Sequence, residues 1–222
     1  MQEIDLSSTE LFQNIAPEEL KQLLTCLGVR KKRYTKGEIL FLEGVPTSQL
    51  GIVLSGRVII EMGDAWGGRS ILGTVRAGGT FAEAYACIPD EPLLVTVSAA
   101  EDTTVMLVNA GCVLSTCPNR CEFHSILIQN LLTLCARKNL QLSRRMQHTA
   151  QKTIRGRLVS YFSQCAKQAG SLQFDVPYNR QQLADYLNVD RSALSAELGR
   201  MQRDGLITFQ RSHFELLSAL SI

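Results

Sequence analysis

Two short amphipathic segments joined by a tight turn constrain this chain more than any other feature. They lie within residues 178–207, YNRQQLADYLNVDRSALSAELGRMQRDGLI. Asn188 tolerates the left-handed backbone that a tight turn needs, and Asp190 is a good cap for a following helix. The residues expected to face inward are Leu183, Ala184 and Leu187 in the first helix, and Leu194, Leu198 and Met201 in the second. This spacing is typical of a helix-turn-helix.

The outward face of the second helix carries short polar and basic side chains. These are Arg191, Ser192, Ser195 and Arg200. Arginine can pair with guanine through two hydrogen bonds, and serine can donate or accept one at a base edge. Arg180 opens the first helix, where a side chain crosses the DNA backbone. A helical hairpin without DNA would show no such bias, and the segment LITFQRSHFELLS that follows is typical of a two-stranded wing. We therefore expect DNA binding.

Charge and composition agree with this expectation. The last 73 residues carry 9 Lys/Arg and 6 Asp/Glu, whereas the first 149 carry 14 and 15. The N-terminus, MQEIDLSSTE, does not resemble a signal peptide, and no apolar run approaches the roughly 18–20 residues that a membrane span needs. Seven cysteines with irregular spacing fit a reducing compartment. We expect a cytoplasmic protein with no membrane partner.

The N-terminal half changes its pattern near Arg30. Residues 7–27 predict short helices, with Pro17 opening one of them. The segments that follow are short, rich in β-branched residues and separated by glycine-containing turns: ILFLEG, LGIVLSGRVIIEM, RSILGTV and LLVTVSA. They predict a closed or double-sheet β structure over about residues 30–110.

A long helix is predicted over residues 118–148, with a seam whose members alternate steps of four and three. The seam residues are Ile128, Leu132, Cys135, Asn139, Leu142 and Met146. Such a heptad seam suits pairing with a second helix. A neighbouring stripe, Leu127, Leu131 and Leu134, would face the chain's own β domain. The alternative is a single broad core face without dimerisation. A hinge is expected at 149–152, followed by a helix over 153–169.

Three cysteines and a histidine lie close together in VNAGCVLSTCPNRCEFH: Cys112, Cys117, Cys121 and His124. Cys117 would cap a helix that begins at Pro118, where its thiolate is stabilised. The set could sense redox state or bind a metal as Cys₃His, or the cysteines could be structural. The three histidines lie outside the β region, and neither a nucleophile elbow nor a phosphate loop is present. We predict no catalytic residues and identify no cofactor.

These motifs, in this order, resemble the Crp/Fnr family of bacterial transcription regulators. The matching pieces are KGEILFLEG, LGIVLSGRVII, GTFAEAY, the long helix and RQQLADYLNVDRSALSAELGRM. The resemblance implies an α+β chain with three parts: a jelly-roll effector domain (1–117), a dimerisation helix and hinge (118–149), and a winged helix-turn-helix domain (150–222). It also implies a homodimer on palindromic double-stranded DNA, with half-sites about one helical turn apart, and RNA polymerase as a partner.

By position, the family's base-reading residues fall on Arg191, Ser192, Ser195 and Ala196, and its phosphate-contacting arginine falls on Arg180. Ala196 departs from the arginine often found there and cannot hydrogen-bond a base. Fnr-like proteins hold an iron–sulfur cluster through cysteines near the N-terminus. The first 25 residues here contain none, so that mechanism does not carry over.

The effector cup is expected within GTFAEAYACIPDEPLLVTVSA. In relatives that bind cyclic AMP, a glutamate holds the ribose and an arginine neutralises the phosphate. Glu83 takes the ribose position, but Leu93 and Leu94 stand where the arginine and the Ser/Thr would be. A buried phosphate without a cation costs several kcal/mol, so we reject cyclic AMP unless another arginine (Arg57, Arg69 or Arg76) reaches in.

Two interpretations of the cup stay open. It could hold a less polar or differently charged small molecule, with Glu83, Tyr85 and Cys87 as polar groups beside Phe81, or the leucines could simply fill it. We therefore predict an allosteric, dimeric transcription regulator whose effector is not cyclic AMP. The alternatives are a regulator with a degenerate cup, one that senses through its cysteines, and a dimeric sensor that does not bind DNA.

Overall fold

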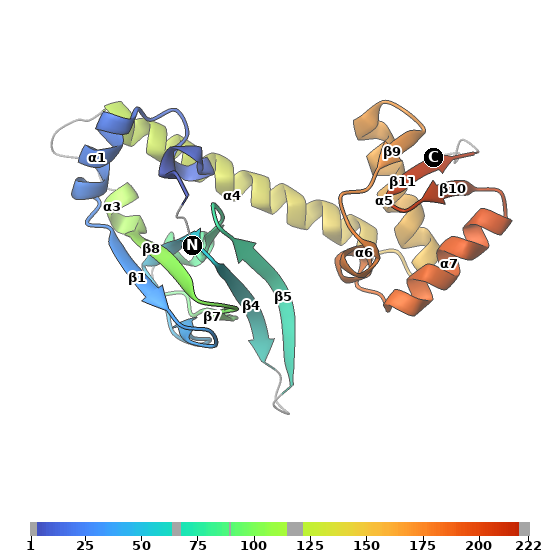
Figure 1. Cartoon of the computed structure of the whole chain (residues 1–222), viewed down its shortest axis with the longest axis horizontal. Helices are drawn as coiled ribbons and strands as arrows, with labels where there is room; N and C mark the ends of the chain where they lie inside the picture. The colour runs from blue at the N-terminus through green and yellow to red at the C-terminus, as the bar shows by residue number, and fades with distance from the viewer. Residues whose placement is uncertain (1–3, 64–67, 89, 115–121, 218–222) are drawn as a thin grey trace. The chain divides into compact units, whose positions relative to one another are not determined.

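The computed structural model describes residues 4–63, 68–88, 90–114 and 122–217. The chain forms two compact units, residues 1–137 and 138–222, and the long helix α4 (Glu122–Thr149) contributes to both (Figure 1). The α+β fold class predicted from the sequence is confirmed. Among the described residues, no helix is both long enough and apolar enough to cross a membrane.

Unit 1 begins with three short helical segments. They are η1 (Leu6–Ser8), η2 (Glu10–Phe12) and α1 (Pro17–Cys26). The predicted helices are present, but the first two are 3₁₀ turns because Thr9 between them has an extended backbone. Pro17 occupies the first position of α1, and the Glu19 carboxylate accepts a hydrogen bond from the N–H of Ala16.

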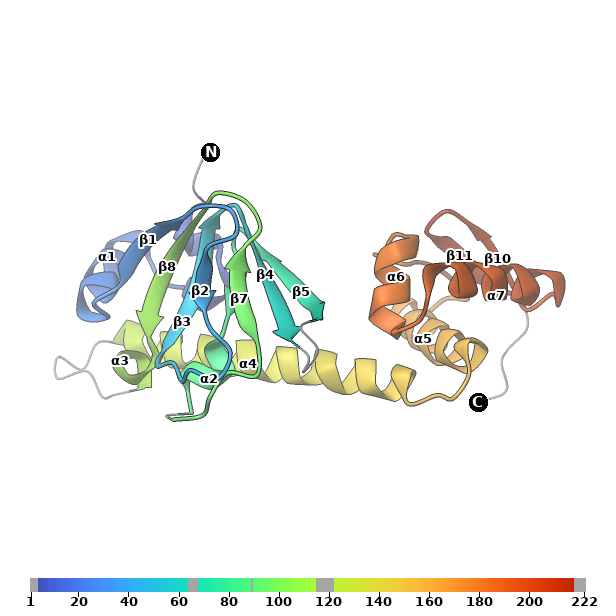
Figure 2. The same cartoon turned by 90° about the horizontal axis from the view of Figure 1, so that it is seen from below.

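The β domain consists of two four-stranded antiparallel sheets, ordered β1-β8-β3-β6 and β2-β7-β4-β5 (Figure 2). The strands are β1 (Arg30–Tyr34), β2 (Ile39–Phe41), β3 (Gln49–Ser55), β4 (Arg57–Gly63), β5 (Arg69–Arg76), β6 (Thr80–Phe81), β7 (Thr96–Ala99) and β8 (Thr103–Asn109). Side chains from both sheets, among them Val53, Val58, Phe81 and Val97, form one core. The predicted double-sheet structure is thereby confirmed.

A second core lies between the first sheet and the helices of unit 1. Apolar residues of β3 and β8 pack there against α1, α3 (Ala110–Leu114) and the first part of α4. Leu127, Leu131 and Leu134 of α4 are buried, as the sequence stripe predicts. The amide of Asn130 donates hydrogen bonds to two carbonyls of the N-terminal segment, those of Leu11 (3.0 Å) and Gln13 (2.8 Å). These contacts fix one face of α4 against its own β domain.

In the described part of unit 2 (138–217), three helices and one small sheet follow the end of α4. The elements are α5 (Ile154–Ala169), β9 (Gln173–Asp175), α6 (Arg180–Leu187), α7 (Arg191–Arg203), β10 (Ile207–Gln210) and β11 (His213–Leu216), with the strands ordered β10-β11-β9. Thr153 caps the start of α5, and Gly170 ends it with φ 62°. The predicted helices and wing are present, and β9 adds a third strand.

Candidate functional sites: a DNA-reading helix pair and an effector cup

The turn between α6 and α7 is held by local hydrogen bonds. Asn188 adopts φ 52°, and its N–H donates to the carbonyls of Ala184 and Asp185 at the end of α6. Asp190 then caps α7 by accepting from the N–H groups of Ser192 (2.8 Å) and Ala193 (3.0 Å). Hydrogen bonds from Ser192 hold the pKa of Asp190 below its ordinary value. The cap therefore stays charged at the positive end of the helix.

The four predicted base-reading positions are all exposed on the first turns of α7: Arg191, Ser192, Ser195 and Ala196. The Ser192 hydroxyl donates to Asp190, and the Ser195 hydroxyl donates to the carbonyl of Arg191 at 2.9 Å. Both serine hydroxyl protons are donated to acceptors of this chain. The lone pairs of the two serine oxygens are left to accept hydrogen bonds from outside. In this arrangement the serines act as acceptors, and Arg191 supplies the donor.

Arg200 differs from the other predicted contacts because it already has a partner. Its Nη1 lies 2.9 Å from Oε2 of Glu197, a buried carboxylate on α7. The second oxygen of Glu197 accepts from Nε of Arg155 at 2.6 Å, and Arg155 also bonds Asp204 at 2.7 Å. The sequence analysis did not identify Arg155 or Glu197. Through this network, Arg155 at the start of α5 contacts α7 at two places: Glu197 in the middle of the helix and Asp204 just after its last residue.

Arg180 at the start of α6 lies over two aromatic rings of the wing. Its guanidinium carbon is 5.1 Å from the ring centre of Phe209 and 5.8 Å from that of Phe214. Burial in this position lowers its pKa. The contact connects the first helix of the pair to β10 and β11, and it holds the guanidinium in one place.

In the β domain, the predicted cup residues gather around a short helix, α2 (Glu83–Ala86). Ala82 precedes it with φ 59°, and the Glu83 side chain is buried. Phe81 packs against Phe41 at 5.6 Å between ring centres, and a β-carbon at Gly51 would overlap the Phe81 ring. Burial, and then the charge of Glu83, raise the pKa of the Cys87 thiol. The carboxylate of Glu83 and the thiol of Cys87 therefore interact across α2, whereas the Phe81 ring packs into the core between the two sheets.

The two leucines of the cup have different surroundings. Leu93 is 2% exposed, whereas Leu94 is 64% exposed. The N–H of Leu94 donates to the hydroxyl of Tyr85 at 3.4 Å, and its side chain turns outward because alternate residues of an extended segment face opposite sides. The idea that both leucines fill the cup is therefore wrong for Leu94.

Two of the three arginines considered as substitutes for the missing cation have acidic neighbours. Arg57 lies 3.8 Å from Glu101, and Arg69 lies 3.9 Å from Glu61. Both pairs are partly exposed to solvent, and Arg76 forms no ion pair with any residue that the structure describes.

The predicted seam of α4 is largely uncovered within this chain. Leu132, Leu142 and Met146 are 70%, 61% and 69% exposed, and Asn139 is exposed too. Ile128 and Cys135 are half-buried beside the core of unit 1. Three large apolar side chains at heptad spacing on one helix face form an unusual exposed stripe.

The cysteine–histidine group is described only in part. Cys112 is exposed, and Nε2 of the buried His124 lies 2.8 Å from the carbonyl oxygen of Val113. Cys117 and Cys121 lie outside the described residues, so the Cys₃His set stays a prediction. Within the described ranges, no three His, Cys, Asp or Glu side chains are grouped as a metal site would require.

Comparison with known proteins follows this division into two units. Residues 31–119 match the cyclic nucleotide-binding domain, and residues 156–219 match the Crp-like helix-turn-helix domain. An effector-binding domain followed by a DNA-binding domain defines a class of transcription regulator. The chain belongs to the Crp/Fnr family of these regulators. Comparison with curated proteins gives no match.

Several solved structures share the fold. CprK in complex with OCPA is similar with a TM-score of 0.64 and 12% identity, over 90% of this chain and 92% of that one. The c-di-GMP responsive global regulator CLP of Xanthomonas campestris has a TM-score of 0.54 and 17% identity, over 90% and 98%. The catabolite activator protein of Thermus thermophilus has a TM-score of 0.51 and 20% identity, over 94% and 93%.

Proposed function

We propose that this regulator binds a palindromic DNA site as a homodimer and is gated by an effector in the β domain that is not cyclic AMP. The observation that carries the proposal is the exposed start of α7, where a cap charged at neutral pH and a helix-turn-helix present Arg191, Ser192 and Ser195 together. A donor beside two acceptors can distinguish base pairs in the major groove.

Dimerisation is supported by the two faces of α4. One face is buried against the β domain, while the other exposes Leu132, Leu142 and Met146. A second copy of the same helix would cover this stripe, with Asn139 fixing the register. We accordingly propose α4 (Glu122–Thr149) as the dimerisation helix of the predicted 118–149 segment, whose residues 118–121 lie outside the described residues, and we place RNA polymerase among the partners of the DNA-bound dimer.

The exclusion of cyclic AMP rests on charge. Leu93, which follows Pro92 where relatives that bind cyclic AMP have the phosphate-binding arginine, is buried, and two of the three other candidate arginines, Arg57 and Arg69, have acidic neighbours; Arg76 is the third. Glu83, Tyr85 and Cys87 remain as polar groups for a ligand that lacks a phosphate. An effector here would favour one of two arrangements of the α4 helices in the dimer and so change the spacing of the α7 helices.

The proposal is tested by selecting DNA from a random double-stranded pool with the full chain. We expect an inverted repeat whose half-sites are about one helical turn apart. Selection of a single unrepeated half-site would contradict the dimer, and selection of no sequence above the starting pool would contradict sequence-specific binding.

A further inference from the structure

Unit 2 contains a cavity of its own. It has a volume of about 920 Å³ and is lined by residues of α4, α5, β9, α6 and the segment before α6, all within residues 138–222. Sites for small molecules usually have volumes of about 300–1,000 Å³ and are lined by apolar and aromatic groups with a few polar ones. The size of this cavity therefore suits a small organic molecule.

One wall of the cavity consists of three tyrosines from three different segments. The rings of Tyr178 and Tyr186 stack at 5.0 Å and 27°, and Tyr161 lies 5.3 Å from Tyr186. Burial raises the pKa of all three hydroxyls, so they stay protonated donors. Among the described residues, the hydroxyls of Tyr178 and Tyr186 form no hydrogen bond. The wall thus offers flat aromatic surface together with unused donors.

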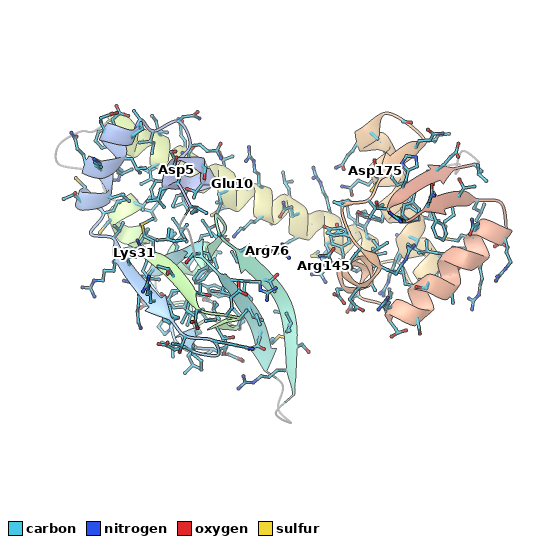
Figure 3. The ribbon with its side chains drawn as sticks, viewed as in Figure 1. Asp5, Glu10, Lys31, Arg76, Arg145 and Asp175 are labelled. Carbon is cyan, nitrogen blue, oxygen red and sulfur yellow. The ribbon has the colours of Figure 1, made fainter. Side chains whose placement is uncertain are left out.

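The charges around the cavity are mainly positive. Lys138, Arg144 and Arg145 line it, against a single lining carboxylate, Asp175, which bonds His213 at 3.1 Å. Arg145 lies at the end of α4 beside α6 (Figure 3), where its Nε and Nη2 donate to the carbonyls of Tyr186 and Asp185. Arg144 forms no ion pair with any residue that the structure describes. An anionic group could pair with Arg144 without displacing an existing contact.

From this combination we propose that the cavity binds a planar aromatic anion. The ring would lie against the tyrosine wall, and the carboxylate of such a ligand would pair with Arg144 and accept from a tyrosine hydroxyl. A neutral aromatic molecule would provide no negative charge for Arg144. An aliphatic anion would provide no flat ring to cover the tyrosine wall. The proposal concerns binding within unit 2 and does not depend on DNA recognition or on the β-domain effector. Leu142 of the predicted α4 seam also lines the cavity, so the ligand and a second copy of α4 would lie next to each other.

The test uses isothermal titration calorimetry on the full chain with naphthalene-2-carboxylate as the probe. Two comparison compounds separate the two contributions: naphthalene-2-carboxamide keeps the rings without the charge, and cyclohexanecarboxylate keeps the charge without the rings. We expect one site per chain for the probe, with at least tenfold weaker binding of both comparison compounds.

Two variants locate the site. Arg144→Gln should weaken probe binding by about three- to tenfold, while Lys167→Gln, which removes a charge from α5 outside the cavity, should not. Ala169 is an exposed lining residue, so Ala169→Trp should fill the cavity and abolish binding without removing a core contact. Circular dichroism checks that each variant is folded. Unchanged binding in folded Ala169→Trp would place the probe elsewhere and overturn the proposal, as would equal binding of the carboxamide or no binding of the probe at all.

Discussion

The buried carboxylate of Glu197 on α7 lies 2.6 Å from Nε of Arg155 on α5. Glu197 is 8% exposed, and it also accepts from Arg200. A charge that is this buried is stable only while its partners are in place. The pair therefore links the orientation of the DNA-reading helix to the helix that follows the end of α4.

Removing the charge of Glu197 should loosen α7. We expect Glu197→Gln to lower the free energy of unfolding by about 1–3 kcal/mol, because a buried charged hydrogen bond is lost. Urea unfolding followed by circular dichroism measures this. Asp185→Asn is the matched control, since the Asp185 side chain is exposed and, among the described residues, accepts a hydrogen bond only from Gln181. Equal stabilities of Glu197→Gln and the wild type would show that the network does not hold the helix.

Arg191 and Arg180 should affect DNA binding in different ways. Arg191→Ala should cost about 1–3 kcal/mol on the selected site and less on unrelated DNA, because a base contact is lost. Arg180→Gln should weaken binding to all sequences alike and reduce the slope of log K against log salt by about one, because a phosphate contact is lost. Fluorescence anisotropy over a salt series measures both effects. The assignment of Arg191 as a base reader fails if its removal weakens all sequences equally.

Local signals in the sequence predicted the helix pair almost completely. Asn188, Asp190 and Gly170 each act on backbone groups within a few residues, so their roles can be read without knowledge of distant parts of the chain. Short β-branched segments between glycine turns likewise predicted β2, β3, β4, β5 and β7. Strands β6, β8 and β9 were not among the predicted segments, nor was β1, whose sequence, RKKRY, is almost entirely charged and suits its place at the edge of a sheet.

Features that depend on distant residues could not be predicted in the same way. Glu197 has the sequence context of an ordinary surface glutamate, and its burial follows from Arg155, which lies 42 residues earlier in the chain. Leu93 and Leu94 are identical in type, and only the path of the chain decides which one is buried. The tyrosine wall of unit 2 is likewise assembled by folding from separate segments.

The exposed seam of α4 predicts a specific effect on oligomeric state. Leu142→Glu would place a charge in the apolar contact between two helices, and we expect the dimer dissociation constant to rise by about 100-fold, or about 2.8 kcal/mol. Light scattering after size-exclusion chromatography measures the mass over a range of concentrations. Leu140→Glu is the matched control, because Leu140 is 54% exposed on the same helix but lies outside the seam. Similar masses for the two variants would argue against this seam.

Cyclic AMP should not stabilise the protein. A ligand present at about 100 times its Kd would add about 2.7 kcal/mol to the free energy of unfolding and raise Tm. With Leu93 buried at the position of the phosphate-binding arginine, we expect no rise in Tm with cyclic AMP, and AMP at equal concentration serves as the control. Thermal unfolding is measured over a series of cyclic AMP concentrations. A saturable rise in Tm would show binding, and cyclic AMP would then be a candidate effector again.

His148, near the end of α4, should make stability depend on pH. Its ring is buried, with Nδ1 2.8 Å from the Ser160 hydroxyl and the ring of Tyr161 5.5 Å away in an edge-on contact. Burial lowers the pKa of His148 in the folded state. The unfolded chain therefore takes up the proton first, and stability present above about pH 6.5 is lost as the pH falls through that value.

We accordingly expect the free energy of unfolding to decrease from pH 7.5 to pH 5.5 in the wild type, and to decrease less in His148→Gln. Urea unfolding at several pH values measures the difference, and the window lies above the range in which Asp5 and Asp190 titrate, since the pKa of each is lowered. His213→Gln is the control, because it removes a histidine whose side chain is 54% exposed rather than buried. If His148→Gln keeps the full pH dependence, another group is responsible, and the burial of His148 does not control stability in this range.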